Sequence, residues 1–217
     1  MSTIIVFAGG TSVPPTAVDE LPDADRVIAA DSGYLIAMSL GYKVDTVVGD
    51  MDSIGSMSEI DESIEVVRHP VDKDATDLEL AFELAVRDQP RRIVLVGAEG
   101  GRFDHELAAV SVICSYRWNV VPEIDWVRSD AISYVIRHTR RIQGDPGDQI
   151  SLIPVGGDAV GVATTGLKWE LNGETLHSGS TRGVSNVFLR TEIMVRLSAG
   201  ALLGVIPAQP RHLLDSQ

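Results

Sequence analysis

The sequence predicts an α/β fold, in which an N-terminal, mostly parallel sheet with flanking helices is followed by a small C-terminal antiparallel β-sandwich. Up to about Val127, short apolar runs alternate with segments that have helical spacing of apolar residues, which is the pattern of a parallel sheet. After Val127, glycine and short alternating runs dominate, and no long amphipathic helix is evident. We therefore expect an α/β domain over residues 1–127 and a β-sandwich domain over residues 128–217.

Each strand expected in the first domain is a short apolar or β-branched run, and most of these runs stop at glycine or aspartate. The expected strands are Ile4–Ala8, Arg26–Ala30, Thr46–Val48, Glu65–Arg68, Ile93–Val96 and Ile124–Val127. The expected helices are Tyr34–Leu40, Thr76–Arg87 and a segment from Asp104 to about Arg117. Gly41 is a suitable residue to end the first of them, and Asp104 can cap the last.

Turn signals organise the second domain. Asn172-Gly173 predicts a two-residue hairpin between 168–171 and 174–176. Gly144 to Gly147 is expected to form a turn, and Val187–Leu197 is expected to pair with Leu202–Ile206 across residues 198–200.

The charge balance restricts the class of partner. With 31 acidic and 18 basic residues the net charge is −13, which argues against nucleic acid and is compatible with divalent metals and cationic small molecules. Cys114 is the single cysteine, so no internal disulfide is expected. The N-terminus has no basic region typical of a signal peptide, and the apolar runs are too short to span a bilayer. We expect a soluble cytoplasmic protein without a membrane partner.

Acidic residues recur at the ends of the expected strands. They occur at Asp31, at Asp50 and Asp52, in the segment Lys73–Asp77 and in the segment Gly100–His105. In a parallel sheet the loops that leave the carboxyl ends of the strands lie along one edge, so these four segments should converge on one crevice.

Converging carboxylates require a cation, and Mg²⁺ prefers hard oxygen ligands together with substrate phosphates. Asp50 and Asp52 can direct two oxygens to one ion, and Asp77 can supply a third. Nearby donors suit a polyphosphate: Arg102 offers a bidentate contact and Lys73 a point charge. The backbone of Gly100-Gly101 permits a close approach. These are the components that phosphoryl transfer needs.

Each component also has a structural interpretation. Asp104 or Asp74 alone is more often a helix cap than a catalytic group. An Asp-x-Asp turn such as Asp50–Asp52 is as often a solvated turn as a metal site. His105 is interpreted as a structural histidine. The convergence of all four segments favours the site over these alternatives.

The succession of motifs resembles the thiamine pyrophosphokinase family. The residues that carry the resemblance are Asp31-x-Gly33, Gly49-Asp50-x-Asp52-Ser53, Lys73-Asp74-x-Thr76-Asp77 and Gly100-Gly101-Arg102-x-Asp104-His105, with Gly166-Leu167-x-Trp169-x-Leu171 and Ser185-Asn186 in the second domain. They follow one another in the order and spacing of the family and extend over nearly the whole chain.

The resemblance implies transfer of a pyrophosphoryl group from ATP to thiamine, with Mg²⁺ held by Asp50, Asp52 and Asp77. It implies nucleotide or phosphate contacts from Asp31, Lys73, Thr76 and Arg102, and it places Asp104 near the transferred group, where we expect it to orient or deprotonate the thiamine hydroxyl. It further implies a homodimer with thiamine bound near the subunit interface.

The resemblance also implies a thiamine-binding segment at Ser185 and Asn186. Some family members have a tryptophan shortly after this pair that stacks on thiamine, whereas this chain has Val187 and Phe188. Phe188 or Trp169 is a candidate to replace it, and Trp169 is also interpreted as a core residue.

Two other functions remain open at this point. A Mg²⁺-dependent nucleotide phosphohydrolase would use the same carboxylates with water as the acceptor. A non-catalytic sensor of thiamine or nucleotide would not need four carboxylate-bearing segments.

Overall fold

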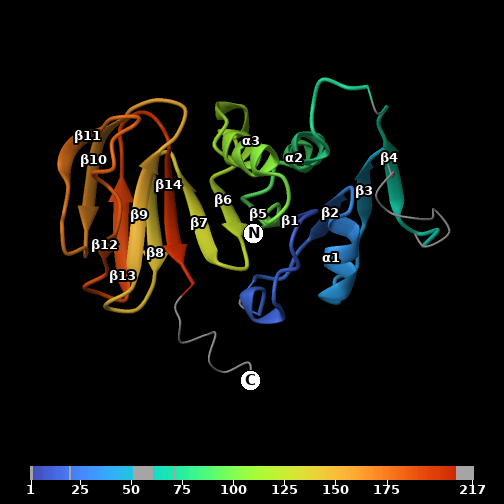
Figure 1. The fold of residues 1–217 in the computed structure, drawn as a ribbon, viewed down its shortest axis with the longest axis horizontal. Coiled ribbons are helices and arrows are strands. Elements are labelled where there is room, and N and C mark those ends of the chain that lie inside the picture. Colours follow the sequence, from blue (N-terminus) through green and yellow to red (C-terminus); the bar gives the residue numbers. More distant parts are fainter. Residues whose placement is uncertain (1, 20, 51–60, 71, 209–217) are drawn as a thin grey trace. The chain divides into compact units, whose positions relative to one another are not determined.

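The computed structural model describes residues 2–19, 21–50, 61–70 and 72–208. The chain divides into two compact units (Figure 1). The first consists of residues 1–112 and 120–129, and the second of residues 113–119 and 130–217. No helix in the described part of the chain is long and apolar enough to cross a membrane.

The first unit is built on parallel strands in the order β6-β5-β1-β2-β3-β4 (Figure 1). In chain order they are β1 (Thr3–Ala8), β2 (Arg26–Ala30), β3 (Thr46–Gly49), β4 (Glu65–Arg68), β5 (Arg92–Gly97) and β6 (Glu123–Val127). Every residue of β1 is buried, as expected for a central strand with both faces covered. The predicted parallel sheet is confirmed, with strand ends shifted by one residue at most.

The helices of this unit are α1 (Gly33–Ser39), α2 (Asp77–Arg87) and α3 (Phe103–Ile113). α1 buries Tyr34 and Ile36 against Ile5 and Phe7 of β1. α2 packs over β1, β2 and β3, on the other side of these strands from α1 (Figure 1).

The last of the three expected helices ends earlier than predicted. α3 stops at Ile113 because Ser115 is extended, with φ −60° and ψ 136°. The Ser115 hydroxyl accepts a hydrogen bond from the N–H of Arg117 at 3.3 Å, which caps a separate 3₁₀ turn, Tyr116–Trp118. A second 3₁₀ turn, Pro15–Ala17, lies between β1 and β2.

The strand order creates a switch point beside β1. From β1 the chain proceeds to β2, β3 and β4 on one side, and then returns to β5 on the other side. The loops that follow β1 and β5 therefore leave the sheet in opposite directions, which is where ligands bind in open α/β sheets.

The second unit is a β-sandwich. Its antiparallel strands have the orders β12-β9-β14-β7 and β11-β10-β13-β8. They are β7 (Ala131–Ile136), β8 (Thr139–Gln143), β9 (Gln149–Pro154), β10 (Ala159–Thr165), β11 (Asn172–Leu176), β12 (Asn186–Val187), β13 (Glu192–Arg196) and β14 (Leu202–Pro207). Leu152 and Leu202 of the first sheet share one buried cluster with Val162 and Val195 of the second, so the predicted sandwich is confirmed.

Two details predicted for this unit are wrong. Asn172 and Gly173 do not form a hairpin turn, because both lie inside β11, which pairs with β10. Ala163 is opposite Asn172 and Val162 is opposite Glu174, so Gly173, at φ +81°, is the extra residue of a β-bulge. The signal for a turn was in fact the signal for a bulge, since both require a positive φ.

The second error concerns the pairing of Val187–Leu197 with Leu202–Ile206. β13 pairs with β8 and β10, whereas β14 pairs with β7 and β9, so the two strands belong to different sheets. The connection between them crosses the sandwich and is held by a bridge between Ala199 and Val160.

Candidate active site

A cavity of about 310 Å³ lies at the switch point, at the carboxyl-terminal edge of the parallel sheet. Its lining comes from the loop after β1, the end of β2, the start of α2 and the connection from β5 to α3. These segments contribute Gly9 and Gly10, Asp31, Thr76 and Asp77, and Glu99, Gly101, Arg102, His105 and Glu106. The structure therefore brings together segments that lie far apart in the sequence, as the parallel topology predicts.

Four of the residues predicted for the metal and phosphate site are described by the structure but do not line this cavity: Asp50, Lys73, Gly100 and Asp104. Gly100, at φ +70°, packs so closely on Thr11 that a Cβ at this position would overlap the Thr11 hydroxyl. The N–H of Thr11 donates to the carbonyl oxygen of Glu99 at 2.7 Å. The loop after β1 and the loop after β5 are therefore held together by close packing and by a backbone hydrogen bond.

Lys73 stands between two of the predicted metal ligands. Its Nζ is 2.8 Å from Asp77 Oδ1 and 3.7 Å from Asp50 Oδ2. Burial acts to lower the pKa of Lys73, but the hydrogen bond and charge of Asp77, with the charge of Asp50, outweigh it and raise the pKa above its ordinary value. Lys73 is therefore cationic and compensates the two carboxylates, and its contact with phosphate stays a prediction.

Asp31 supplies a buried acceptor to the cavity. Its backbone is in the left-handed region at φ +47°, and its N–H donates to the carbonyl of Val48 at 2.9 Å. The Asp31 Oδ1 atom is buried and has no hydrogen-bond partner in the described part of the chain. A buried carboxylate oxygen without a partner is costly, so this atom fits a bound cation or a hydrogen-bond donor of a ligand.

The carboxylates around β3 have the chemistry of a site for a hard divalent cation. A Cβ added to Gly49 would lie 3.1 Å from Asp77 Oδ1 and 3.4 Å from the Cβ of Asp31, so both side chains reach the end of β3, where Asp50 follows. Asp52 lies outside the described residues. Within the described residues no three acidic, histidine or cysteine side chains cluster as metal ligands. Oxygen donors with one unpartnered atom nevertheless fit Mg²⁺.

Arg102 and Asp104 are paired with each other at the entrance to α3. Arg102 donates from Nη2 to Asp104 Oδ2 at 2.6 Å and from Nε to Asp104 Oδ1 at 3.1 Å. This hydrogen bonding lowers the pKa of Asp104. Both side chains are exposed, at 72% for Arg102 and 63% for Asp104, so the pair can open at little cost.

Thr76 and His105 both line the cavity. The Thr76 hydroxyl accepts the N–H of Glu79 at 3.2 Å, so Thr76 is the N-cap of α2 as well as part of the cavity wall. His105, which the sequence indicates is a structural histidine, is exposed at the cavity. Sequence analysis did not identify Glu99 and Glu106, because a glutamate in a glycine-rich loop or in a helical first turn carries no distinctive signal.

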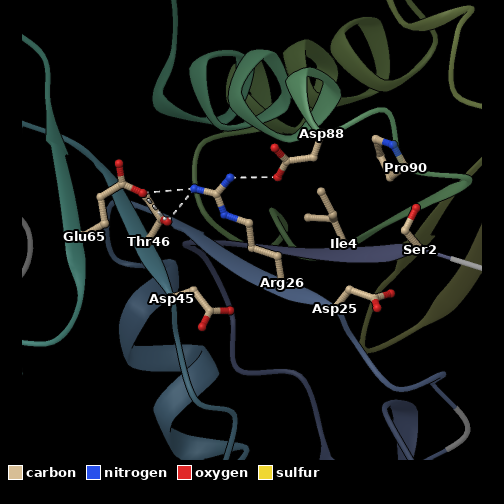
Figure 2. A pocket seen from close by; sticks show the side chains of 9 residues that line it. All are labelled: Ser2, Ile4, Asp25, Arg26, Asp45, Thr46, Glu65, Asp88 and Pro90. Carbon is tan, nitrogen blue, oxygen red and sulfur yellow. Dashed lines mark hydrogen bonds and ion pairs between the residues drawn. The ribbon is translucent and has the colours of Figure 1, made fainter.

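A larger cavity, of about 440 Å³, lies at the opposite edge of the sheet (Figure 2). Arg26 occupies its centre, with Nη1 2.8 Å from Asp88 Oδ2 and Nη2 3.0 Å from Glu65 Oε2. Asp25 and Asp45 accept backbone N–H groups of Thr3 and Val27 at 2.7 Å and 2.8 Å. These acidic groups already have partners, so we interpret this cavity as a structural junction of β2, β3, β4 and α2.

In the second unit, the side-chain amide of Asn186 forms hydrogen bonds with the backbone of Trp169. Its Oδ1 accepts the N–H of Trp169 at 3.1 Å and its Nδ2 donates to the carbonyl of Trp169 at 2.7 Å. Oδ1 also accepts the N–H of Val187 at 2.9 Å. Asn186 is buried, at 6% exposure, so in this structure its amide positions Trp169 and is not presented to a ligand.

The two aromatic candidates for stacking on thiamine, Phe188 and Trp169, differ in their exposure to solvent. Phe188 is fully buried in the sandwich core, so the expectation that it replaces the stacking tryptophan is wrong. Trp169 is 55% exposed, which contradicts its interpretation as a core residue, and Lys168 Nζ lies 4.6 Å from the centroid of its ring. Ser185 is exposed and has a positive φ of 59°.

Comparison with known proteins connects both units to one family. A family model described as "Thiamin pyrophosphokinase, catalytic domain" matches residues 18–122, and one described as "Thiamin pyrophosphokinase, vitamin B1 binding domain" matches residues 133–202.

Similar proteins carry the same family name. Thiamine pyrophosphokinase 1 of Oryza sativa subsp. japonica is 32% identical over 162 residues, which are 67% of this chain; the chain spans 60% of the length of that relative. Thiamine pyrophosphokinase of Bacillus subtilis (strain 168) is 28% identical over 210 residues, which are 94% of this chain and 97% of that protein.

The fold is similar as well. The crystal structure of thiamine pyrophosphokinase from Bacillus subtilis matches with a TM-score of 0.83 at 25% identity, covering 96% of this chain and 100% of that chain. The two family models together span most of the sequence. One matches before and the other after Val127, where the sequence pattern changes from alternating strands and helices to short alternating runs. This chain therefore belongs to the thiamin pyrophosphokinase family.

Proposed function

We propose that this protein transfers the pyrophosphoryl group of ATP to the hydroxyl of thiamine, which yields thiamine diphosphate and AMP. The observation that carries the proposal is the cavity at the switch point, in a chain that belongs to this family. Its wall combines the unpartnered oxygen of Asp31 with Arg102 and the backbone of Gly101. The acceptor hydroxyl attacks the β-phosphorus, the bond from this phosphorus to the α-phosphate oxygen breaks, and AMP leaves.

Asp50, Asp52 and Asp77 are the residues that would hold Mg²⁺, which would neutralise charge on the phosphate oxygens of ATP. Lys73, which pairs with Asp77 and lies 3.7 Å from Asp50, is the proposed cationic contact for the phosphates of ATP. The N-terminus of α2, at Asp77, adds a dipole that favours an anion.

Arg102 and Asp104 exchange partners during binding in this proposal. Arg102 turns from Asp104 to the phosphate oxygens, which it can hold in bidentate fashion. Asp104 then loses the interaction that keeps its pKa low, and becomes a better acceptor for the proton of the thiamine hydroxyl.

The exposed ring of Trp169 and the hydroxyl of Ser185 are the proposed contacts for thiamine in the second unit. An aromatic face attracts a cationic ring such as a thiazolium. Asn186 contributes by holding the backbone of Trp169. We further propose a cytoplasmic homodimer with thiamine bound near the subunit interface, on the basis of the family resemblance; light scattering of the purified protein tests the dimer.

Product analysis tests the activity. The protein is incubated with ATP and Mg²⁺, with and without thiamine, and the products are separated by chromatography. We expect equal amounts of thiamine diphosphate and AMP, formed only when thiamine and the metal are both present. Thiamine monophosphate with ADP would contradict pyrophosphoryl transfer, and nucleotide cleavage without thiamine would indicate a phosphohydrolase. Binding of either ligand without turnover would indicate a sensor.

A further inference from the structure

We propose that Glu99, acting through Arg128, is a positioning residue that holds the connection from β5 to α3 in the conformation that binds the phosphates of ATP. This inference rests on the proposed function. Glu99 lies next to the predicted phosphate-binding segment Gly100–Arg102 and belongs to none of the motifs that identify the site.

The connection from β5 to α3 has an unfavourable backbone conformation. Gly97, Ala98 and Gly100 have φ of +87°, +59° and +70°. Glycine tolerates such values, but Ala98 is an L-residue in the left-handed region, which is disfavoured by steric contact of its Cβ. A segment with these dihedral angles persists only where surrounding contacts determine it.

Glu99 supplies these contacts from a buried position. Its side chain is 4% exposed. Oε1 accepts the backbone N–H of Ser129, and Oε2 lies 3.4 Å from Nη2 of Arg128. Its own carbonyl accepts the N–H of Thr11. A carboxylate this deeply buried is tolerable only with such partners, so Glu99 binds the loop to the end of β6 and to the loop after β1.

Arg128 connects Glu99 to the first turn of α3. Its Nη1 donates to Glu106 Oε1 at 2.6 Å, and its guanidinium lies 4.8 Å from the centroid of the Trp126 ring. Trp126 in turn donates from Nε1 to the carbonyl of Gly97 at 2.7 Å. The end of β6 thus contacts the loop at Gly97, at Glu99 and, through α3, at Glu106.

These contacts bracket the phosphate-binding segment. Gly100, Gly101 and Arg102 lie between the anchor at Glu99 and the anchor at Glu106. If the loop relaxed, the backbone of Gly101 and the guanidinium of Arg102 would leave the cavity wall that they now form. A displacement of about 1 Å in a positioning group can cost on the order of 100-fold in rate.

The test compares Glu99→Gln with a matched control, Asp125→Asn. Asp125 is also a buried acid, paired with Arg92 at 2.6 Å, and it joins the same two strands, β5 and β6, away from the loop. Gln keeps the acceptor for Ser129 but turns an amide N–H₂ toward Arg128. Both variants are expected to unfold at lower denaturant concentration than the wild type, since each disrupts a buried ion pair.

Only Glu99→Gln should change the phosphate site. In hydrogen exchange, the peptide that covers residues 98–102 is expected to exchange faster in this variant alone. The Kd of a non-hydrolysable ATP analogue and the KM for ATP should rise about tenfold or more, with little change in the KM for thiamine. Arg128→Lys keeps the charge but loses the planar guanidinium that contacts Glu99, Glu106 and the Trp126 ring. It should show the same pattern, and it replaces Glu99→Gln if that variant does not fold.

The outcomes separate the inference from the proposed function. Exchange and nucleotide affinity as in the wild type in Glu99→Gln or Arg128→Lys would overturn the inference. Equal effects in Asp125→Asn would also overturn it, because they would show general destabilisation. A wild-type protein that binds no nucleotide would instead overturn the proposed function, and the exchange comparison would still decide whether Glu99 holds the loop.

Discussion

At the scale of single residues, Asp77 and Asp50 differ in how strongly they interact with Lys73. The short contact of Lys73 with Asp77, at 2.8 Å, is a hydrogen-bonded ion pair, whereas its distance of 3.7 Å to Asp50 permits only a weaker attraction. The side chains are partly buried, at 14% exposure for Lys73 and 22% for Asp77, so the pair is less screened by solvent than a surface pair. The two aspartates should therefore contribute differently to stability without metal.

We predict that Asp77→Asn lowers the free energy of unfolding by about 1 kcal/mol without metal, because it weakens a charge-assisted hydrogen bond. Asp50→Asn should change it by less than about 0.5 kcal/mol, because it also relieves repulsion between carboxylates. In both variants the extra stability that Mg²⁺ and ATP confer on the wild type should be lost. Urea unfolding with and without these ligands measures all of these quantities. Retained stabilisation in either variant would remove that residue from the proposed metal site.

At the scale of elements, one residue at the start of α2, Thr76, both caps the helix and is a proposed contact for phosphate. Thr76 is extended, at φ −72° and ψ 157°, and caps the helix through its hydroxyl. We predict that Thr76→Ala lowers the free energy of unfolding by about 1 kcal/mol, the usual cost of a lost N-cap. Thr76→Ser keeps the cap and should be close to wild type.

Steady-state kinetics of the same two variants separates the roles. If Thr76 also contacts phosphate, the KM for ATP should rise in Thr76→Ala and stay near the wild-type value in Thr76→Ser. An unchanged KM in both variants would leave Thr76 as a cap only.

A second element-scale prediction concerns the segments 166–169 and 186–189. Lys168 donates its N–H to the carbonyl of Val187 at 2.9 Å, and Asn186 holds Trp169, so the two segments form one unit. We predict that Asn186→Ala lowers the free energy of unfolding by about 1–2 kcal/mol, since it leaves partly buried backbone groups of Trp169 without their hydrogen-bond partner. Ser185→Ala should leave stability nearly unchanged, because this side chain is exposed.

Asn186→Ala and Ser185→Ala should each lower kcat/KM for thiamine, as measured by steady-state kinetics. Binding of a non-hydrolysable ATP analogue, as measured by calorimetry, should stay nearly the same as in the wild type. Equal losses for the two ligands would contradict the assignment of thiamine binding to the second unit.

At the scale of the whole molecule, the net charge of −13 opposes compaction through repulsion among the carboxylates. We predict that raising NaCl from about 10 mM to about 200 mM, which shortens the Debye length from roughly 30 Å to less than 10 Å, raises Tm by about 2–4 °C. MgCl₂ at matched ionic strength should stabilise the wild type further but not Asp77→Asn. Identical responses of the two proteins to MgCl₂ would indicate screening alone.

Much of the first unit was predictable because local and global signals agree there. A continuous apolar run such as Val27–Ala30 is typical of a parallel strand that is covered on both faces, and all four of these residues are buried. The second unit was less predictable. Gly173 has the same dihedral preference in a turn and in a bulge, and its neighbours in sequence do not distinguish the two.

The sequence by itself determined the fold class and the strands after which Asp31, Asp50 and Arg102 come, because apolar runs, their periodicity and the alternation of strands with helices can be read from short segments. Only the tertiary structure decided how these side chains are paired. The contacts of Lys73 with Asp50, of Asn186 with Trp169 and of Glu99 with Arg128 join residues that are far apart in sequence, so their relative positions depend on packing of the whole unit. A buried polar group takes whichever partner the packed backbone places within hydrogen-bond distance, and that distance is not encoded in any short segment.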